Sequence, residues 1–291
     1  MKQPANAAHP KAKNPWLDAW HSLKKNKMAL VGGCVLLFFI LVTIFADFIA
    51  PHAADTQDWM HIMEGPSRDY PLGTDSYGRC VFSRIVYGSR ISLLVGFVAV
   101  AFSAIGGGII GACAGYFRGR LDNVLMRLMD VLLAIPSILL AIAIVNILGP
   151  SLINVMIAVG LSSMPSFARI VRAAVLSIRD SEFIEAAVAI GDSTAAIIWH
   201  NILPNCLAPI IVQATLGVAS AILSAAGLSF LGLGLQPPSP EWGAMLSEGK
   251  AMITKYPHLC IFPGLAIMVV VLALNMLGDG LRDAMDPKLK N

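Results

Sequence analysis

One stretch without a charged side chain runs for 38 residues, from Val131 to Ala168. A transmembrane helix needs about 20 apolar residues, so this run is long enough for two helices, and Gly149-Pro150-Ser151 divides it. We predict six transmembrane helices, over 28–46, 91–117, the two halves of 131–168, 206–231 and 256–278. Small residues such as Gly106 to Gly108 and Gly111 are expected to let neighbouring helices approach closely.

The composition fits a polytopic membrane protein. Asp, Glu, Lys and Arg make up only 13% of the 291 residues and 56% are hydrophobic, whereas a soluble domain carries about 25% charged residues. Intrinsic disorder is excluded because disordered chains are rich in charge and poor in aromatic residues. The five cysteines form no CxxC pair and no zinc-type spacing with histidine, so we predict neither a disulfide framework nor a metal site.

The lysines and arginines predict the orientation. The apolar core of a cleavable signal peptide is only about 7–15 residues long, so a retained first helix over 28–50 is predicted after a basic head, residues 1–27. Cytoplasmic loops carry the excess of Lys and Arg. With both chain ends inside, 15 of the 21 lie on the inner side, although the predicted outer loop holds four arginines. The remaining predicted segments are the outer loop 51–90, a five-helix core 91–285 with an inner loop at 180–205, and an inner tail 286–291.

No motif for ATP binding is present in the sequence. A phosphate-binding loop needs Gly, four residues and then Gly-Lys-Ser/Thr, and the only Gly-Lys pair, Gly249-Lys250, is followed by Ala251. Among the scarce charges near the apolar runs, Arg127 and Asp130 can pair at the start of the third helix. They fit either an interfacial ion pair or an ion relay. An ion-coupled carrier normally holds more buried polar groups, so we predict a transport protein, not an enzyme, that is driven from outside the membrane.

The polar segment 180–205 predicts two short helices on the cytoplasmic surface. The first would be capped by Asp180 or Ser181 and ended by Gly191, the second would be capped by Asp192 or Ser193, and Pro204 would close the segment. Glutamates in the first turn of the first helix suit the positive end of its dipole. On physical grounds this pair of helices is either an interfacial anchor or a docking element for a partner.

This segment resembles the EAA loop of ABC-importer permeases. Glu-Ala-Ala at 185–187 is followed by three residues and a glycine, and Leu-Pro comes twelve and thirteen positions after that glycine. In the family this loop fits into a cleft on the ATPase subunit. The resemblance implies this coupling role for Glu185, Ala186, Ala187, Gly191, Leu203 and Pro204. Asn201 departs from the pattern, in which an apolar residue is common at that position.

Three further stretches resemble the permeases for oligopeptides, dipeptides and nickel. The first is 71–79 in the predicted outer loop, and its family-motif residues are Gly73, Thr74, Asp75, Gly78 and Arg79. The other two are 227–243 and 278–287. The long first outer loop resembles the second, C-type permease of the pair. Cys80 stands where many members have Asp, which leaves the substrate open.

The resemblance implies an all-α permease of the type I ABC-importer kind in the bacterial inner membrane. Its expected partners are the lipid bilayer, a paralogous permease, two cytoplasmic ATPase subunits and an extracytoplasmic binding protein, with no nucleic acid. No cofactor is expected in this chain, because ATP and magnesium would be bound by the ATPase subunits. The expected substrates are dipeptides or oligopeptides. Nickel or another metal chelate, an ion-coupled secondary transporter and an export permease are the alternatives.

Overall fold

The computed structural model describes residues 15–285, with side chains from residue 20 onward. The first part of the predicted basic head and the predicted inner tail 286–291 lie outside the described residues. From residue 15 to residue 285 every regular element is helical, apart from an isolated antiparallel bridge between Thr74 and Cys80. The predicted all-α class is confirmed.

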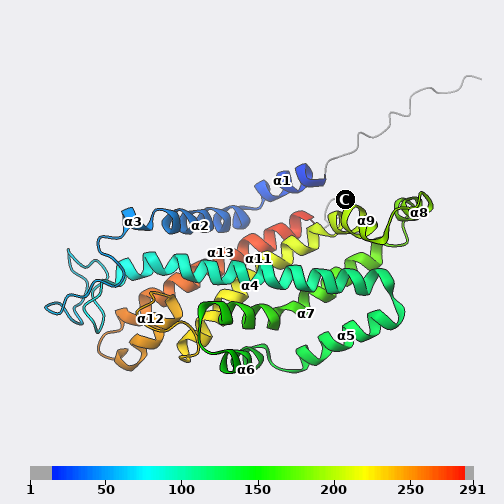
Figure 1. Ribbon diagram of the computed structural model, residues 1–291. Coiled ribbons are helices and arrows are strands. Elements are labelled where there is room, and N and C mark those ends of the chain that lie inside the picture. Colours follow the sequence, from blue (N-terminus) through cyan, green and yellow to red (C-terminus); the bar gives the residue numbers. More distant parts are fainter. Residues whose placement is uncertain (1–14, 286–291) are drawn as a thin grey trace, which may run out of the picture.

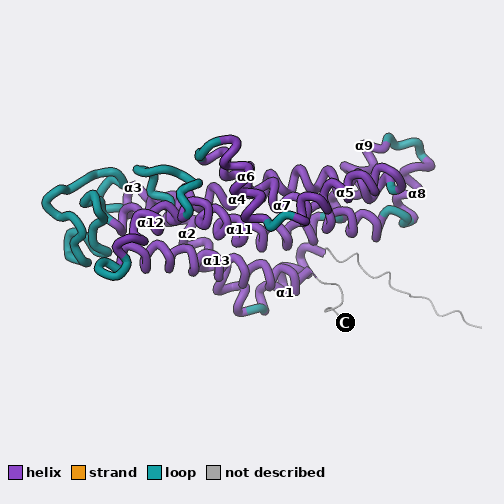
Figure 2. Tube along the Cα trace, turned by 90° about the horizontal axis from the view of Figure 1, so that it is seen from below, coloured by secondary structure: helices purple, strands orange, loops and turns teal. Residues whose placement is uncertain are grey.

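The helices run back and forth along an elongated bundle (Figures 1 and 2). They are α1 (Pro15–Lys25), α2 (Lys27–Ile44), α3 (Ala46–Ile49), α4 (Val81–Phe117), α5 (Gly119–Ala134), α6 (Ser137–Leu148), α7 (Leu152–Ile178), α8 (Glu182–Ala189), α9 (Thr194–Ala196), the π-helical turn η1 (Ile197–Ile202), α10 (Leu203–Asn205), α11 (Leu207–Phe230), α12 (Trp242–Gly249), the 3₁₀ turn η2 (Lys250–Met252) and α13 (His258–Met285). Figure 1 shows α1, α8, α9 and the last turns of α13 at one end of the bundle, which we call the α8 end. The loop before α4 and α12 lie at the opposite end, the α12 end.

Five predicted transmembrane helices are single helices that are long and apolar enough to cross a membrane: α2, α4, α7, α11 and α13. Three of them extend well beyond the predicted boundaries, among them α13, which continues to Met285 rather than ending at Gly278. α4 begins at Val81 rather than Ile91, inside the predicted outer loop, and α7 continues to Ile178. The early start of α4 is possible because Arg84 and Arg90, which set the predicted boundary, lie in ion pairs.

The third predicted helix is broken in two. α5 and α6 meet at a bend of 91°, and they make a sixth span only if the bent pair is counted as one. Pro136 explains the break, because proline lacks an N–H and forces an extended backbone on the residue before it. Ile135 has φ −94° and ψ 128°, which is extended.

The ion pair suggested for Arg127 and Asp130 is replaced by another one in the structure. Asp130 accepts a 2.6 Å bond from Arg169 of α7.

α4 and α7 pack closely because glycines face the contact. A Cβ atom added to Gly107 would lie 2.6 Å from the carbonyl oxygen of Met164, and Gly111 meets a backbone carbonyl one turn further along α7. The predicted close approach is confirmed at these two positions. Gly108 differs, because a Cβ atom there would have no neighbour within 4 Å.

We expect Gly107→Ala to lower the free energy of unfolding by about 1–3 kcal/mol, the usual cost of overpacking a well-packed contact. Gly108→Ala is the matched control on the next residue of the same helix. It should be neutral or stabilising by about 0.5–1 kcal/mol, because alanine favours a helix over glycine. Thermal unfolding of the two variants in the same detergent or nanodisc measures the difference. Equal stability of the two variants would contradict this packing.

Candidate functional site

The segment that resembles the EAA loop forms a compact helical element at the α8 end. α8 begins after Ser181, one of the two predicted N-cap residues, but the Ser181 side chain forms no capping bond and its hydroxyl donates to the Ile178 carbonyl at 2.6 Å. Gly191 follows α8 with φ +88°, a left-handed conformation that favours glycine. Glu185 and Ala186 are exposed on α8, whereas Ala187 is buried. The helix therefore presents one face to the bundle and another to its surroundings.

The second predicted helix of this segment is not a regular α-helix. Ser193 caps α9 as predicted, with its Oγ accepting a 3.2 Å bond from the N–H of Ala196. The π-helical turn η1 follows. At its end the N–H of Leu203 donates to the carbonyl of Ile198, five residues back instead of the four of an α-helix. This wider turn precedes Pro204, whose ring would clash with a carbonyl four residues back in an α-helix. Pro204 does not close the segment, because the chain continues through α10 into α11.

A small apolar cluster lies beneath α8 and joins it to the bundle. Its buried members are Ala112, Val171, Val175, Ile184, Ala187, Ile197, Ile202 and Cys206. Beside α8 lies a hollow of about 450 Å³, lined by Tyr116, Phe117, Arg179, Asp180, Ile184, Glu185, Val188 and Ala189. The position of α8 therefore depends on side chains from the last turns of α4 and α7.

The family-motif residues of the outer loop form tight turns at the α12 end. Gly73 and Gly78 have φ +82° and +71°, and the backbone of Asp58 lies where a Cβ atom on Gly78 would be. The Thr74 hydroxyl donates to the carbonyl of His61 and accepts a 2.9 Å bond from a backbone N–H. These bonds fold the loop back on itself.

Asp58 lies at the centre of a polar cluster in this loop. Its carboxylate accepts from the Tyr70 hydroxyl and pairs with the His61 ring, both at 2.8 Å. The bond to His61 is the main reason that the pKa of Asp58 is lowered, and the same bond raises the pKa of His61. The cluster favours a charged pair on the loop surface.

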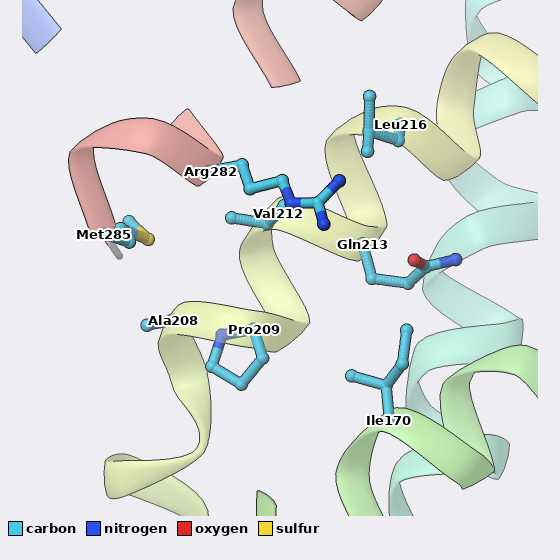
Figure 3. A pocket seen from close by; sticks show the side chains of 8 residues that line it. All are labelled: Ile170, Ala208, Pro209, Val212, Gln213, Leu216, Arg282 and Met285. Carbon is cyan, nitrogen blue, oxygen red and sulfur yellow. The ribbon is translucent and has the colours of Figure 1, made fainter. Parts of the chain in front are cut away.

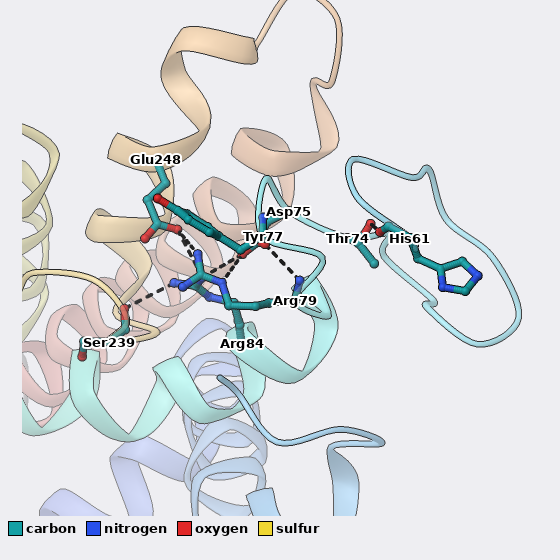
Figure 4. Close-up of polar contacts among 8 residues, drawn as sticks. All are labelled: His61, Thr74, Asp75, Tyr77, Arg79, Arg84, Ser239 and Glu248. Carbon is teal, nitrogen blue, oxygen red and sulfur yellow. Dashed lines mark hydrogen bonds and ion pairs between the residues drawn. The ribbon is translucent and has the colours of Figure 1, made fainter. Parts of the chain in front are cut away.

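A buried ion network joins the outer loop to α4 and α12 (Figure 4). Asp75 accepts from Nε of Arg79 and from a terminal nitrogen of Arg84, both at 2.7 Å. Glu248 of α12 accepts from Arg79 at 2.7 Å and lies 3.2 Å from Arg84. Arg79 and Arg84 are 2% and 0% exposed. Burying these guanidinium groups is tolerable only because both carboxylates pair with them.

α12 is also anchored on α4 through its first turn. Trp242 is fully buried, and its backbone N–H lies 3.3 Å from the Ser92 hydroxyl. The carboxylate of Glu241 caps α12 by accepting bonds from the N–H groups of Gly243 and Ala244, at 2.9 and 2.8 Å. Burial raises the pKa of Glu241, although these N–H groups favour its charged form.

A cavity of about 500 Å³ opens at the α8 end between α7, α11 and α13. Figure 3 shows the guanidinium of Arg282 extending from α13 toward Gln213 of α11. The other lining residues are Ile170, Ala208, Pro209, Val212, Leu216 and Met285. One cation and one amide thus face an otherwise mostly apolar space.

The structure does not bring the two predicted groups of site residues together. Glu185 belongs to α8, and Gly191 and Pro204 belong to the turns that follow it at the α8 end, whereas the outer-loop motif belongs to the loop before α4 at the α12 end (Figure 1). Sequence reasoning did not assign Arg84 or Glu248 to the network around the motif. The available signal was that Arg79 and Arg84 lie close together in a loop predicted to face outward. Unpaired arginines in that loop would weaken the predicted orientation, so acidic partners for them were to be expected.

We expect Glu248→Gln to destabilise the protein by about 3 kcal/mol, because removing one partner leaves buried arginines short of a negative charge. Unfolding followed by tryptophan fluorescence in nanodiscs measures the loss. Glu64→Gln removes the same charge from an exposed position of the outer loop, and it should leave the stability within about 0.5 kcal/mol. A Glu248→Gln protein as stable as this control would rule out a structural role for the network.

Residues 104–291 match the family described as the binding-protein-dependent transport system inner membrane component, and residues 14–66 match the N-terminal TM domain of oligopeptide transport permease C. The chain is 52% identical to the dipeptide transport system permease protein of Alkalihalophilus pseudofirmus, over 96% of this chain and 92% of that protein. It is 46% identical to the glutathione transport system permease protein of Escherichia coli (strain 536), with the same two coverages. It is 45% identical to the di/tripeptide transport system permease protein of Pseudomonas aeruginosa (strain UCBPP-PA14), over 96% and 94%.

Among solved structures, an inward-facing form of the MetNI methionine ABC transporter matches with a TM-score of 0.58 at 20% identity, over 70% of this chain and 97% of that chain. An amino acid ABC transporter matches with a TM-score of 0.53 at 18% identity, over 68% and 92%. These likenesses concern the fold. The family match and the relatives make the chain a multi-pass inner-membrane component of an ABC transporter complex, in which separate subunits hydrolyse ATP. The chain belongs to the binding-protein-dependent ABC-importer permeases, as a C-type subunit of their oligopeptide and dipeptide branch.

Proposed function

We propose that this permease imports peptides of two or three residues. The observation that carries the proposal is the 45–52% identity, along 96% of the chain, to permeases named for dipeptide, glutathione and di/tripeptide transport. Glutathione is itself a tripeptide, so the three names describe one class of substrate. A nickel or other metal chelate is the alternative substrate class, and no name among these three supports it.

In this proposal the α8 end faces the cytoplasm and the α12 end faces outward. The excess of lysine and arginine in the predicted inner segments supports this orientation. Three of the four arginines that weaken it are not free charges in the structure. Arg79 and Arg84 pair with Asp75 at 2.7 Å, and Arg90 pairs with Asp47 at 2.9 Å. Their guanidinium groups are bound within the outer part of the protein.

α8 and the turn after it dock on an ATPase subunit. The surface of α8 and of the turn after it that faces away from the bundle combines exposed Glu185 with exposed apolar side chains. Phe183 is 45% exposed, Val188 is 55% exposed and Ile190 is 78% exposed. An exposed apolar patch with a polar rim is typical of a protein-binding surface. The hollow beside α8 adds a concave surface for a partner side chain.

The working transporter contains four kinds of subunit. A paralogous permease pairs with this chain and encloses the translocation path, two ATPase subunits bind from the cytoplasm, and a binding protein delivers the peptide at the α12 end. The family's dependence on a binding protein supports the last of these. The rigid outer part, fastened by the buried ion network, gives the binding protein a fixed surface.

We expect Gly191→Pro to abolish import while membrane insertion persists. Proline cannot adopt φ +88° and lacks the N–H that Gly191 donates to the Val188 carbonyl at 3.1 Å. Gly149→Pro is the matched control, because Gly149 also has φ +88° and donates to a helix carbonyl, but at the other end of the bundle. ATPase copurification and peptide uptake should fail only in Gly191→Pro. Equal loss in both variants would argue against docking at α8.

We expect uptake to need ATP hydrolysed by the partner subunits. The complete complex and the permease alone are reconstituted in parallel proteoliposomes, with tritiated alanyl-alanine, glutathione and a nickel–histidine chelate as probes. Uptake of the peptides should require ATP on the cytoplasmic face and should persist when a protonophore collapses the ion gradient. Accumulation by the permease alone would support a secondary carrier. Uptake of nickel–histidine without either peptide would overturn the peptide assignment.

A further inference from the structure

Three ion pairs connect the α5 region with the α7 region. Two of them join α5 to α7, and the third joins the turn before α5 to Asp180, two residues after the end of α7. Arg118 bonds to Asp180 at 2.7 Å, Asp122 pairs with Arg172 at 2.6 Å, and Asp130 pairs with Arg169 at 2.6 Å. The pairs follow one another in antiparallel order along the two segments. We call these three pairs the α5–α7 ladder.

Apolar burial does little to hold α5 in place. Only Asp122 and Met129 among its 16 residues are buried, and side chains such as Val124 and Leu128 are more than half exposed. Within this chain, α5 therefore contributes few buried apolar side chains to its contact with the bundle. The ladder is therefore the main specific connection between α5 and α7.

The middle pair of the ladder has the most demanding geometry. Both carboxylate oxygens of Asp122 accept bonds from Arg172, one from Nε and one from a terminal nitrogen, each at 2.6 Å. Asp122 is 7% exposed. A two-bond arginine–carboxylate pair fixes the relative orientation of its partners as well as their distance. This pair sets the register of α5 against α7.

The first pair of the ladder lies next to α8. Asp180 is two residues before the first residue of α8, and Arg118 reaches it from the turn between α4 and α5. Arg118 has φ 55° and ψ −166°, a backbone conformation that glycine adopts far more readily than arginine. Glycine would fit this backbone better, so the presence of arginine indicates that its side chain is needed. That side chain bonds to Asp180.

We propose that the α5–α7 ladder is a positioning element that makes α5 and α8 move as one body when the ATPase subunits act on α8. This inference rests on the docking role proposed for α8. Asp180 and Arg172 lie on the segment that leads directly into α8, so a displacement of α8 pulls on the ladder. α5 follows because the ladder joins it to α7 and to Asp180 at three points.

The ladder is tested by reversing charges in the complete reconstituted complex. Arg118→Asp and Asp180→Arg each place like charges together, and the double variant restores an opposite pair. We expect each single variant to raise the ATP hydrolysed per imported alanyl-alanine at least fivefold, and the double variant to return it to within twofold of the wild type. Arg120→Asp makes the same charge reversal at an exposed neighbouring position and should change this ratio less than twofold.

Spin labels on Val124 of α5 and Ser177 of α7 report the connection directly. Both residues are exposed, and the labelled protein lacks the native cysteines. The label distance should be the same in nucleotide-free and ATP-bound wild-type complex. It should broaden or shift between the two states in Arg118→Asp and recover in the double variant. A distance that changes in the wild type as much as in Arg118→Asp would overturn the inference.

The outcomes separate this inference from the proposed function. If the wild-type complex shows no ATP-dependent uptake of either peptide, the proposed function fails. If the wild type imports peptide and the single variants keep its ATP-to-peptide ratio, the ladder inference alone fails. If the double variant restores assembly of the complex but not this ratio, the ladder is structural and the inference is overturned.

Discussion

The close contact between α4 and α7 is the interaction on which the rest of the fold depends. α4 runs from the outer loop to the turn before α5, and α7 leads into α8 (Figure 1). Gly107 and Gly160 leave no room for a Cβ atom where the two backbones approach. At the same level Ser103 of α4 donates to the carbonyl of Gly160 at 2.6 Å. In a bilayer lipid competes with apolar packing, so short distances between small residues hold helices together.

Much of the fold could be predicted from apolar runs, because a charge-free stretch of about 20 residues has few alternatives to a transmembrane helix. The predicted ends of these helices were less accurate, because we placed them on the assumption that a charged residue ends a transmembrane span. Arg84 and Arg90 lie inside α4 instead, because each finds a carboxylate partner. Pro136 was the available signal for the break between α5 and α6, and its effect on Ile135 is local.

The predicted site residues were found to different degrees. The helix around Glu185 and the turn at Gly191 follow from local rules of capping and left-handed glycine, so the sequence alone could predict them. The partners of Arg84 and Asp130 could not be predicted in this way. Glu248 and Arg169 lie far from them in the sequence, and the contacts exist only after the helices have packed.

The placement of charge explains how a mostly apolar bundle can still have two well-defined ends. A charged side chain at the centre of a bilayer costs several kcal/mol, on the order of 3 by insertion measurements, so ion pairs that fix geometry belong near the membrane surfaces. The buried network around Arg84 occupies one end and the α5–α7 ladder the other, while the α4–α7 contact between them relies on glycine and serine. The ends differ in exposure: Arg84 is fully buried, whereas Arg169 and Asp180 reach solvent. A network closed to water resists rearrangement, whereas the ladder reaches solvent at its outer pairs and is held at its middle by the two-bond Asp122–Arg172 pair. The α8 end can therefore move relative to the α12 end while the ladder keeps α5 and α8 together.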